Sequence, residues 1–144
     1  AIMLLPILKD AGMEMNDVME IITAVGNHEE QSGTISSAVS AALAIGDKSD
    51  AHKTRVRNGK PDPTDIHDRV NYSISENSVT VDRKARVIRH ELVMDSTSSV
   101  LEYTQIYTPR IIMCEEAAAF LGCSFELVIN GQTVNNRPTR QTNK

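Results

Sequence analysis

The stretch from Val79 to Met94, VTVDRKARVIRHELVM, decides the fold class of this chain. Val79 and Val81 flank a polar residue, and a second apolar stretch covers residues 87–94. Short runs rich in β-branched residues favour strands, and the charged segment 82–84 between the two runs is typical of a turn. The sequence therefore predicts two paired strands here.

The residues that follow predict a helix and a second pair of strands. A long helix is expected from about residue 98 to residue 121, and Pro109 should kink it or split it in two. Residues 125–129 have the pattern of a strand, and Asn130-Gly131 is a strong hairpin signal that leads into residues 132–134. Together these elements predict a small antiparallel α+β unit of the order ββαββ.

The first 60 residues predict helices alone. One helix is expected at residues 2–11, a second with Asn16 as its N-cap, and a third that Thr34 caps and that reaches Asp47. The fold class expected for the whole chain is therefore α+β, with an N-terminal helical portion. The predicted organisation is a helical portion (1–60), a linker with a short helix (61–77), the α+β subdomain (78–134) and a disordered polar tail (135–144).

Composition argues against several classes of partner. The formal charge of −4 and the 3% aromatic content offer neither a general basic field nor stacking platforms, so a nucleic acid is a poor expectation. The longest apolar run, 2–8, contains Pro6 and is much shorter than the roughly 20 residues that span a membrane. Two cysteines make no disulfide framework, and no secretory leader is recognisable. We therefore expect a cytoplasmic protein without a membrane partner.

Candidate functional residues gather around the end of the third helix. On an ideal helix, Asp47 and Asp50 fall on the face of Val39 and Leu43, which we expect to be buried. A carboxylate on that face needs a cation, hydrogen-bond donors or a metal, so a salt bridge or cap, metal ligation and exposure at a frayed end all remain open. His28 beside two glutamates suits either a metal ligand or a surface residue.

A basic cluster follows the two aspartates. Lys48, Lys53, Arg55 and Arg57 lie within ten residues of Asp47. Mixed acidic and basic groups suit a metal-bridged phosphate ester, and they equally suit a solvated charged turn. The spacing alone leaves both interpretations open.

Several segments, taken in order, resemble a bacterial subfamily of HD-domain phosphohydrolases. The resemblance covers nearly the whole chain. The segments that carry it are Gly26-Asn27-His28-Glu29-Glu30, Ala44-Ile45-Gly46-Asp47-Lys48-Ser49-Asp50, Arg55-Val56-Arg57, Asp65-Ile66-His67-Asp68-Arg69-Val70-Asn71-Tyr72, Ile112-Met113-Cys114 and Phe125-Glu126-Leu127-Val128-Ile129-Asn130-Gly131.

The resemblance implies a helical HD-type bundle with a divalent metal ion. Asp47 matches the late aspartate ligand of that family, and His28 matches an intermediate histidine that can join a second metal. Lys48 is then expected in catalysis with Asp47, and Lys48, Arg55 and Arg57 in phosphate binding. The metal would activate a water for attack on a small phosphate ester or nucleotide. Mn²⁺, Mg²⁺, Fe²⁺, Co²⁺ and Zn²⁺ are not distinguishable.

One part of the family pattern does not occur in this sequence. The family's first histidine and its His-Asp pair precede the intermediate histidine, whereas residues 1–27 contain no histidine. His67-Asp68 comes after Asp47, and we interpret it as a residue pair at the joint between subdomains. We therefore expect a piece of a longer enzyme whose metal site is incomplete here. The alternative is a non-catalytic regulatory or oligomerisation module, and a homodimer is expected.

Overall fold

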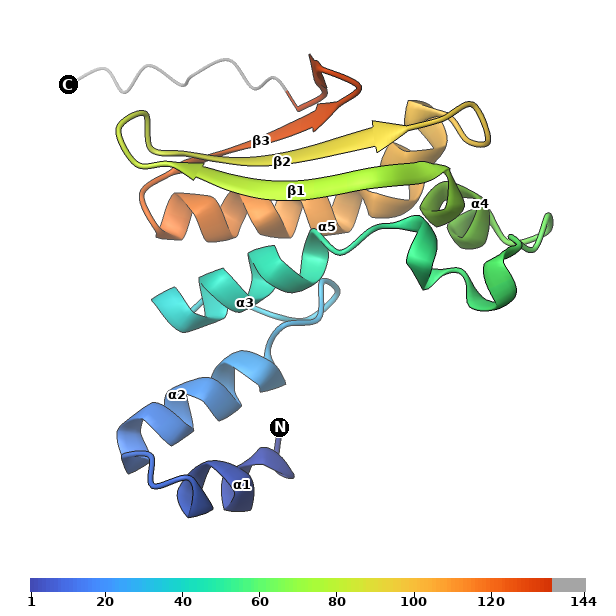
Figure 1. Ribbon diagram of the computed structural model, residues 1–144. Helices are drawn as coiled ribbons and strands as arrows, with labels where there is room; N and C mark the ends of the chain where they lie inside the picture. The colour runs from blue at the N-terminus through green and yellow to red at the C-terminus, as the bar shows by residue number, and fades with distance from the viewer. Residues whose placement is uncertain (136–144) are drawn as a thin grey trace.

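The computed structural model describes residues 1–135, except for the side chain of Asn58. It confirms the α+β class, with helices first and a four-stranded sheet after them (Figure 1). The elements are α1 (Leu4–Asp10), α2 (Met15–Gly26), α3 (Ala38–Lys48), the short 3-10 turns η1 (Lys53–Arg55) and η2 (Arg57–Gly59), α4 (Ile66–Ser73), β1 (Ile74–Asp82), β2 (Val87–Met94), α5 (Val100–Phe120), β3 (Ser124–Ile129) and β4 (Gln132–Thr133).

The sheet has the strand order β1-β2-β3-β4 and is mixed. β1 pairs with β2 antiparallel, as does β3 with β4, and both hairpins match the prediction. β2 and β3, however, pair parallel, with Ile88 opposite Phe125. The expectation of an antiparallel subdomain is wrong at this pair, because α5 lies beneath the sheet and returns the chain to the end where β2 began (Figure 1).

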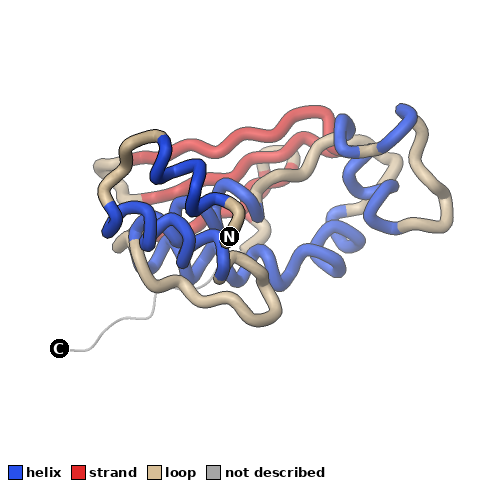
Figure 2. The backbone as a smooth tube through the Cα atoms, turned by 90° about the horizontal axis from the view of Figure 1, so that it is seen from below, coloured by secondary structure: helices blue, strands red, loops and turns tan. Residues whose placement is uncertain are grey.

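α5 and α3 form successive layers beneath the sheet. Figure 2, seen from below, shows the helices in front of the strands. The alternation in β2 buries Ile88, His90, Leu92 and Met94 on the helix side, and one apolar core joins them to α3 and α5. Burial of this continuous apolar surface is the main stabilising contribution. The end of α3 is therefore fixed against the sheet and α5 together.

α5 runs through Pro109 as one helix, so the predicted split does not occur. Proline removes one hydrogen bond from the helix interior and costs about 3 kcal/mol or more. The buried residues on both sides of it, Tyr103 and Tyr107 before and Met113 and Cys114 after, belong to the same core. Packing on both sides of Pro109 outweighs the lost bond and keeps the helix continuous.

Two predicted helix starts are wrong by a few residues. The N-cap residue of α2 is Glu14 rather than Asn16, and α3 is capped by Ser37 rather than Thr34. The Ser37 hydroxyl accepts a bond from the Ser40 backbone, and the Ser40 hydroxyl accepts one from the Ser37 backbone. This reciprocal capping box satisfies two free donors, which a single threonine cannot do.

α1 and α2 lie farthest from the sheet (Figure 1). α1 has no buried residue, and α2 buries only Val18 and Ala24. None of the described helices combines the length and apolar character needed to cross a membrane. Of the predicted polar tail, residues 136–144 lie outside the described residues, whereas the Asn135 side chain bonds to Leu127 and Phe125.

Candidate functional site

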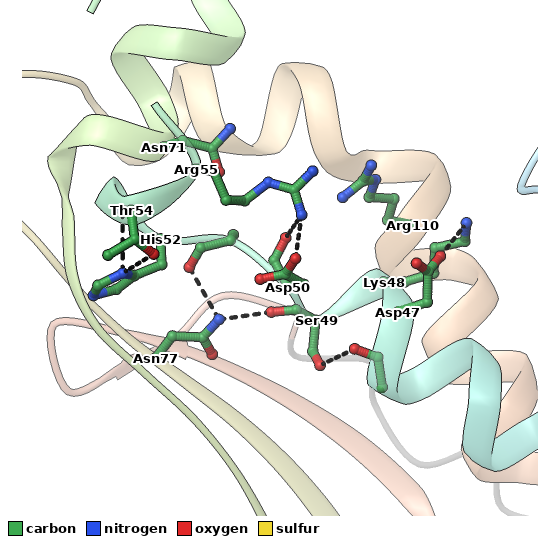
Figure 3. A network of polar contacts seen from close by, with 12 residues as sticks. Asp47, Lys48, Ser49, Asp50, His52, Thr54, Arg55, Asn71, Asn77 and Arg110 are labelled. Carbon is green, nitrogen blue, oxygen red and sulfur yellow. Dashed lines mark hydrogen bonds and ion pairs between the residues drawn. The ribbon is translucent and has the colours of Figure 1, made fainter. Parts of the chain in front are cut away.

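The candidate site lies where the C-terminal end of α3 meets α5 and the loop after α2 (Figure 3). Lys48 is the residue that joins these elements. Its Nζ lies 2.8 Å from Oε2 of Glu30, in the loop, and 2.7 Å from Oδ2 of Asp47, on α3. Its side chain is only 3% exposed. The structure therefore brings the His28–Glu30 loop to Asp47.

Lys48 has a different position from the one its predicted role requires. Burial disfavours the charged form, but the hydrogen bonds to Asp47 and Glu30 outweigh it and raise the pKa of Lys48. The ammonium group is thus kept charged and enclosed between two carboxylates. We expected Lys48 to contact substrate phosphate, whereas in this structure it braces Asp47 and Glu30 instead.

Asp47 is exposed, which corrects the expected burial of its face. The buried side of α3 carries Ser40, Ala41, Ala44, Ile45 and Lys48. Small alanines, rather than Val39 and Leu43, pack closely beneath the sheet, so the helix is rotated relative to the expected orientation. The Asp47 side chain is 44% exposed, and only its Oδ2 has a polar partner among the described residues. Oδ1 is free to bind a ligand.

His28 is half-buried, and its ring is oriented by the end of α2. Nδ1 lies 2.7 Å from the carbonyl oxygen of Val25, which can only accept, so Nδ1 carries the proton. Nε2, the other ring nitrogen, lies 3.6 Å from Oε1 of Glu29. A backbone carbonyl that fixes the tautomer in this way is a common arrangement behind a metal-binding histidine.

Glu30 and Arg110 are functional candidates that sequence reasoning missed. The hydrogen bond from Lys48 lowers the pKa of Glu30 against the opposing effect of burial, so this carboxylate is ionised. Arg110 of α5 places Nε 3.6 Å from Oε1 of Glu30 and its guanidinium carbon 4.9 Å from the centre of the Tyr107 ring. No local spacing links Glu30 to a residue so distant in the chain.

Asp50 and Arg55 form a second pair beside this cluster (Figure 3). Arg55 Nη1 donates to the Asp50 carboxylate and, at 3.3 Å, to the Asp50 carbonyl oxygen. Asp50 follows the end of α3 and is exposed, so its expected place on a buried helix face is also wrong. Arg57 is exposed on η2, and no polar contact joins it to the described residues.

The sheet fixes the chain just after Lys48. Asn77 of β1 donates to the carbonyl oxygens of Ser49, at 2.7 Å, and Ala51, at 2.9 Å. Its own Oδ1 accepts a bond from Nε2 of His90 at 3.0 Å. Burial lowers the pKa of His90 to about 4, against the effect of a hydrogen bond to the Ser49 backbone, so this histidine is neutral near pH 7. This network holds the end of α3 in place.

Asn71 and Tyr107 form a buried polar pair beside Arg110. Asn71 of α4 donates to the carbonyl oxygen of His67 and to the Tyr107 hydroxyl, both at 2.9 Å. His67 also meets the Tyr107 ring edge-on, with centroids 6.2 Å apart. Asn71 Oδ1 is the one buried side-chain oxygen or nitrogen that lacks a partner within residues 1–135. The contacts of Asn71 and His67 with Tyr107 therefore join α4 to α5.

The residues that the resemblance assigns to the metal fit that role only in part. Asp47 offers a carboxylate oxygen without a partner among the described residues, and His28 offers an imidazole ring, and both are suitable ligand types for a divalent ion. Across the described residues, however, no three or more His, Cys, Asp or Glu side chains are grouped to hold a metal. The chain thus supplies two candidate ligands and not a complete set.

Comparison of the chain with models of protein families, with curated proteins and with solved structures found no match.

Proposed function

We propose that this chain is the downstream part of a metal-dependent phosphohydrolase that acts on a small phosphate ester or nucleotide. One observation carries the proposal: an exposed Asp47 carboxylate at the end of α3, braced by the buried Lys48 and left with one free oxygen. The His28–Glu30 loop lies against the same corner through the contact of Glu30 with Lys48.

The proposed metal ligands come from the resemblance, and the proposed role of Lys48 comes from its contacts. Asp47 and His28 would provide two of the ligands of a divalent metal ion. When bound, that ion would supply a polarised phosphoryl oxygen and an activated water. Lys48 orients Asp47, because its ammonium donates to Oδ2 from a buried position. Two free cysteines and a phosphorylated substrate fit a cytoplasmic enzyme.

The test is turnover by the protein expressed from its full reading frame. It is assayed with Mn²⁺ on a generic phosphomonoester and a generic phosphodiester. Asp47→Ala should lower kcat/KM by about a hundredfold or more, since even residues behind a metal ligand typically contribute 10- to 100-fold. Asp17→Ala is the matched control, because Asp17 is an exposed carboxylate on α2 with no role in the candidate site. Turnover that persists in Asp47→Ala at the Asp17→Ala level refutes the proposal.

A second candidate function is a homodimerising, non-catalytic module, and the free edge of β1 favours it. Among the described strands β1 pairs with β2 alone, so its other edge has no strand partner, although the Ser75 carbonyl oxygen at one end lies 3.1 Å from Nε2 of His52. Val79 and Val81 are exposed on the side of the sheet that bears His90 and Ile88, as their cross-strand pairing shows. An exposed apolar edge is a usual template for pairing with a second copy.

Analytical ultracentrifugation at micromolar concentration tests this candidate. A dimer that Val81→Lys converts to a monomer supports pairing through β1, because a charge at an exposed strand edge opposes association. Val93→Lys is the control, since Val93 is exposed on the opposite face of the same sheet. A wild-type monomer excludes the dimer at that concentration.

A further inference from the structure

Arg110 has an unusual combination of restraint and unused hydrogen-bonding capacity. Its side chain is 24% exposed, and its two contacts use Nε, toward Glu30, and the guanidinium plane, over Tyr107. Neither Nη1 nor Nη2 has a polar partner among the described residues. The side chain is therefore positioned while its two terminal donors are free to bind a ligand.

Tyr107 is close enough to both arginines for their charges to act on it. Burial raises the pKa of Tyr107, and the charges of Arg110 and Arg55 oppose that rise. Arg110 lies over the Tyr107 ring, and Figure 3 shows its guanidinium group to one side of the Arg55–Asp50 pair. Arg55 uses only Nη1, in its pair with Asp50, so Nε and Nη2 are also free of protein partners within the described residues.

The chemistry of the two arginines indicates an oxyanion as their ligand. A guanidinium fork matches two oxygens of a phosphate, and a fork already held by an aromatic ring loses little conformational freedom on binding. Lys48, the cation that the sequence favoured for this role, is enclosed by Glu30 and Asp47. The site therefore needs another cation beside Asp47 if phosphate is to bind there.

We propose that Arg110, with Arg55, binds the phosphoryl group of a phosphomonoester at the end of α3. The ligand class rests on the proposed function, whereas the site itself rests on the contacts of the two arginines. Arg110 is accordingly a binding residue contributed by α5, outside the segment from Gly26 to Arg57 that carries the other candidates. Tyr107 is a positioning residue, since it acts through the orientation of Arg110.

The test is a titration of the 144-residue chain, without added metal, with inorganic phosphate and with ribose 5-phosphate, followed by NMR chemical shifts. Arg110→Gln should weaken binding of both by about tenfold or more, the effect of losing a charge-assisted hydrogen bond. Arg110→Lys keeps the charge but loses the fork, so an intermediate loss of several-fold is expected. Arg89→Gln is the matched control, because Arg89 pairs with Glu126 on the outer side of the sheet.

The outcomes separate this inference from the proposed function. Unchanged phosphate affinity in folded Arg110→Gln and Arg110→Lys overturns the inference, as does an equal loss in Arg89→Gln or no binding by the wild type. Thermal unfolding verifies the fold of each variant. If Arg110→Gln loses binding while turnover of the full protein is insensitive to Asp47, the arginine site stands and only the hydrolase proposal fails.

Discussion

Replacement of Lys48 by methionine tests the most enclosed charge in the candidate site. Methionine approximates the length of the lysine stem but removes the ammonium group that lies 2.8 Å from Glu30 and 2.7 Å from Asp47. Removing one partner of a buried ion pair costs about 3 to 5 kcal/mol, because the remaining charge has no counterion. The exposures of the two carboxylates narrow this range of the expected loss in unfolding free energy.

The two carboxylates should respond differently to the loss of Lys48. Asp47 is 44% exposed and can regain water, so its share of the cost is small. Glu30 is only 15% exposed and is left with Arg110, whose Nε is 3.6 Å away. We therefore expect Lys48→Met to lower the free energy of unfolding by about 2 to 3 kcal/mol, mostly through Glu30.

Equilibrium urea unfolding at pH 7 measures this effect. Glu30→Gln should restore part of the stability lost in Lys48→Met, so that the double variant is about 1 to 2 kcal/mol more stable than additivity predicts. The contribution of Glu30, whose pKa is lowered in the fold, is present above its ordinary value of 4.5 and is lost as the pH falls through the lowered pKa. A Lys48→Met cost below about 0.5 kcal/mol, or no coupling to Glu30, refutes the reasoning.

Two further predictions concern the sheet. The unfolded chain takes up a proton on His90 below about pH 6.5 and the folded chain only near pH 4, so the wild type should lose about 2 to 3 kcal/mol of stability between pH 7.5 and 4.5. Urea unfolding at both pH values should show a smaller loss in His90→Gln, and equal losses count against a buried neutral histidine. Asn130 has a φ of 51° and bonds to both backbone groups of Met94. Asn130→Ala should therefore cost about 2 to 3 kcal/mol and Asn130→Gly about 1 kcal/mol less, since glycine adopts positive φ freely. The same unfolding assay compares the two variants. If Asn130→Gly is less stable than Asn130→Ala, the positive φ of residue 130 does not cost the alanine variant stability.

The parts of the fold that the sequence predicts well depend on neighbours along the chain. Asn130-Gly131 gives a hairpin because both residues take positive φ, at 51° and 76°, and join the short strands β3 and β4. The long helix starts at a capping box in which Ser99 and Glu102 bond to each other's backbone. Such signals involve only a few adjacent residues, so pattern alone is sufficient.

The candidate site could not be predicted in the same way, because its contacts depend on tertiary packing. Periodicity on α3 placed Asp47 on the buried face, but packing of Ala41 and Ala44 beneath the sheet turned Lys48 inward instead. Because the predicted buried face was wrong by one residue, Asp47 was expected to be buried, whereas Lys48 is buried and Asp47 is exposed. The contact of Glu30 with Arg110 joins a loop to a helix near the other end of the chain, so no spacing could reveal it.

Asp47→Asn in the full-length protein tests whether the Asp47 carboxylate serves a phosphohydrolase site, as proposed above. Asparagine has the same shape and can still accept a hydrogen bond from Lys48, but it is uncharged. We expect kcat/KM for a phosphate ester with Mn²⁺ to fall by about a hundredfold or more while thermal unfolding changes little. An Asp47→Asn protein that hydrolyses the ester at the wild-type rate would rule out this role for Asp47.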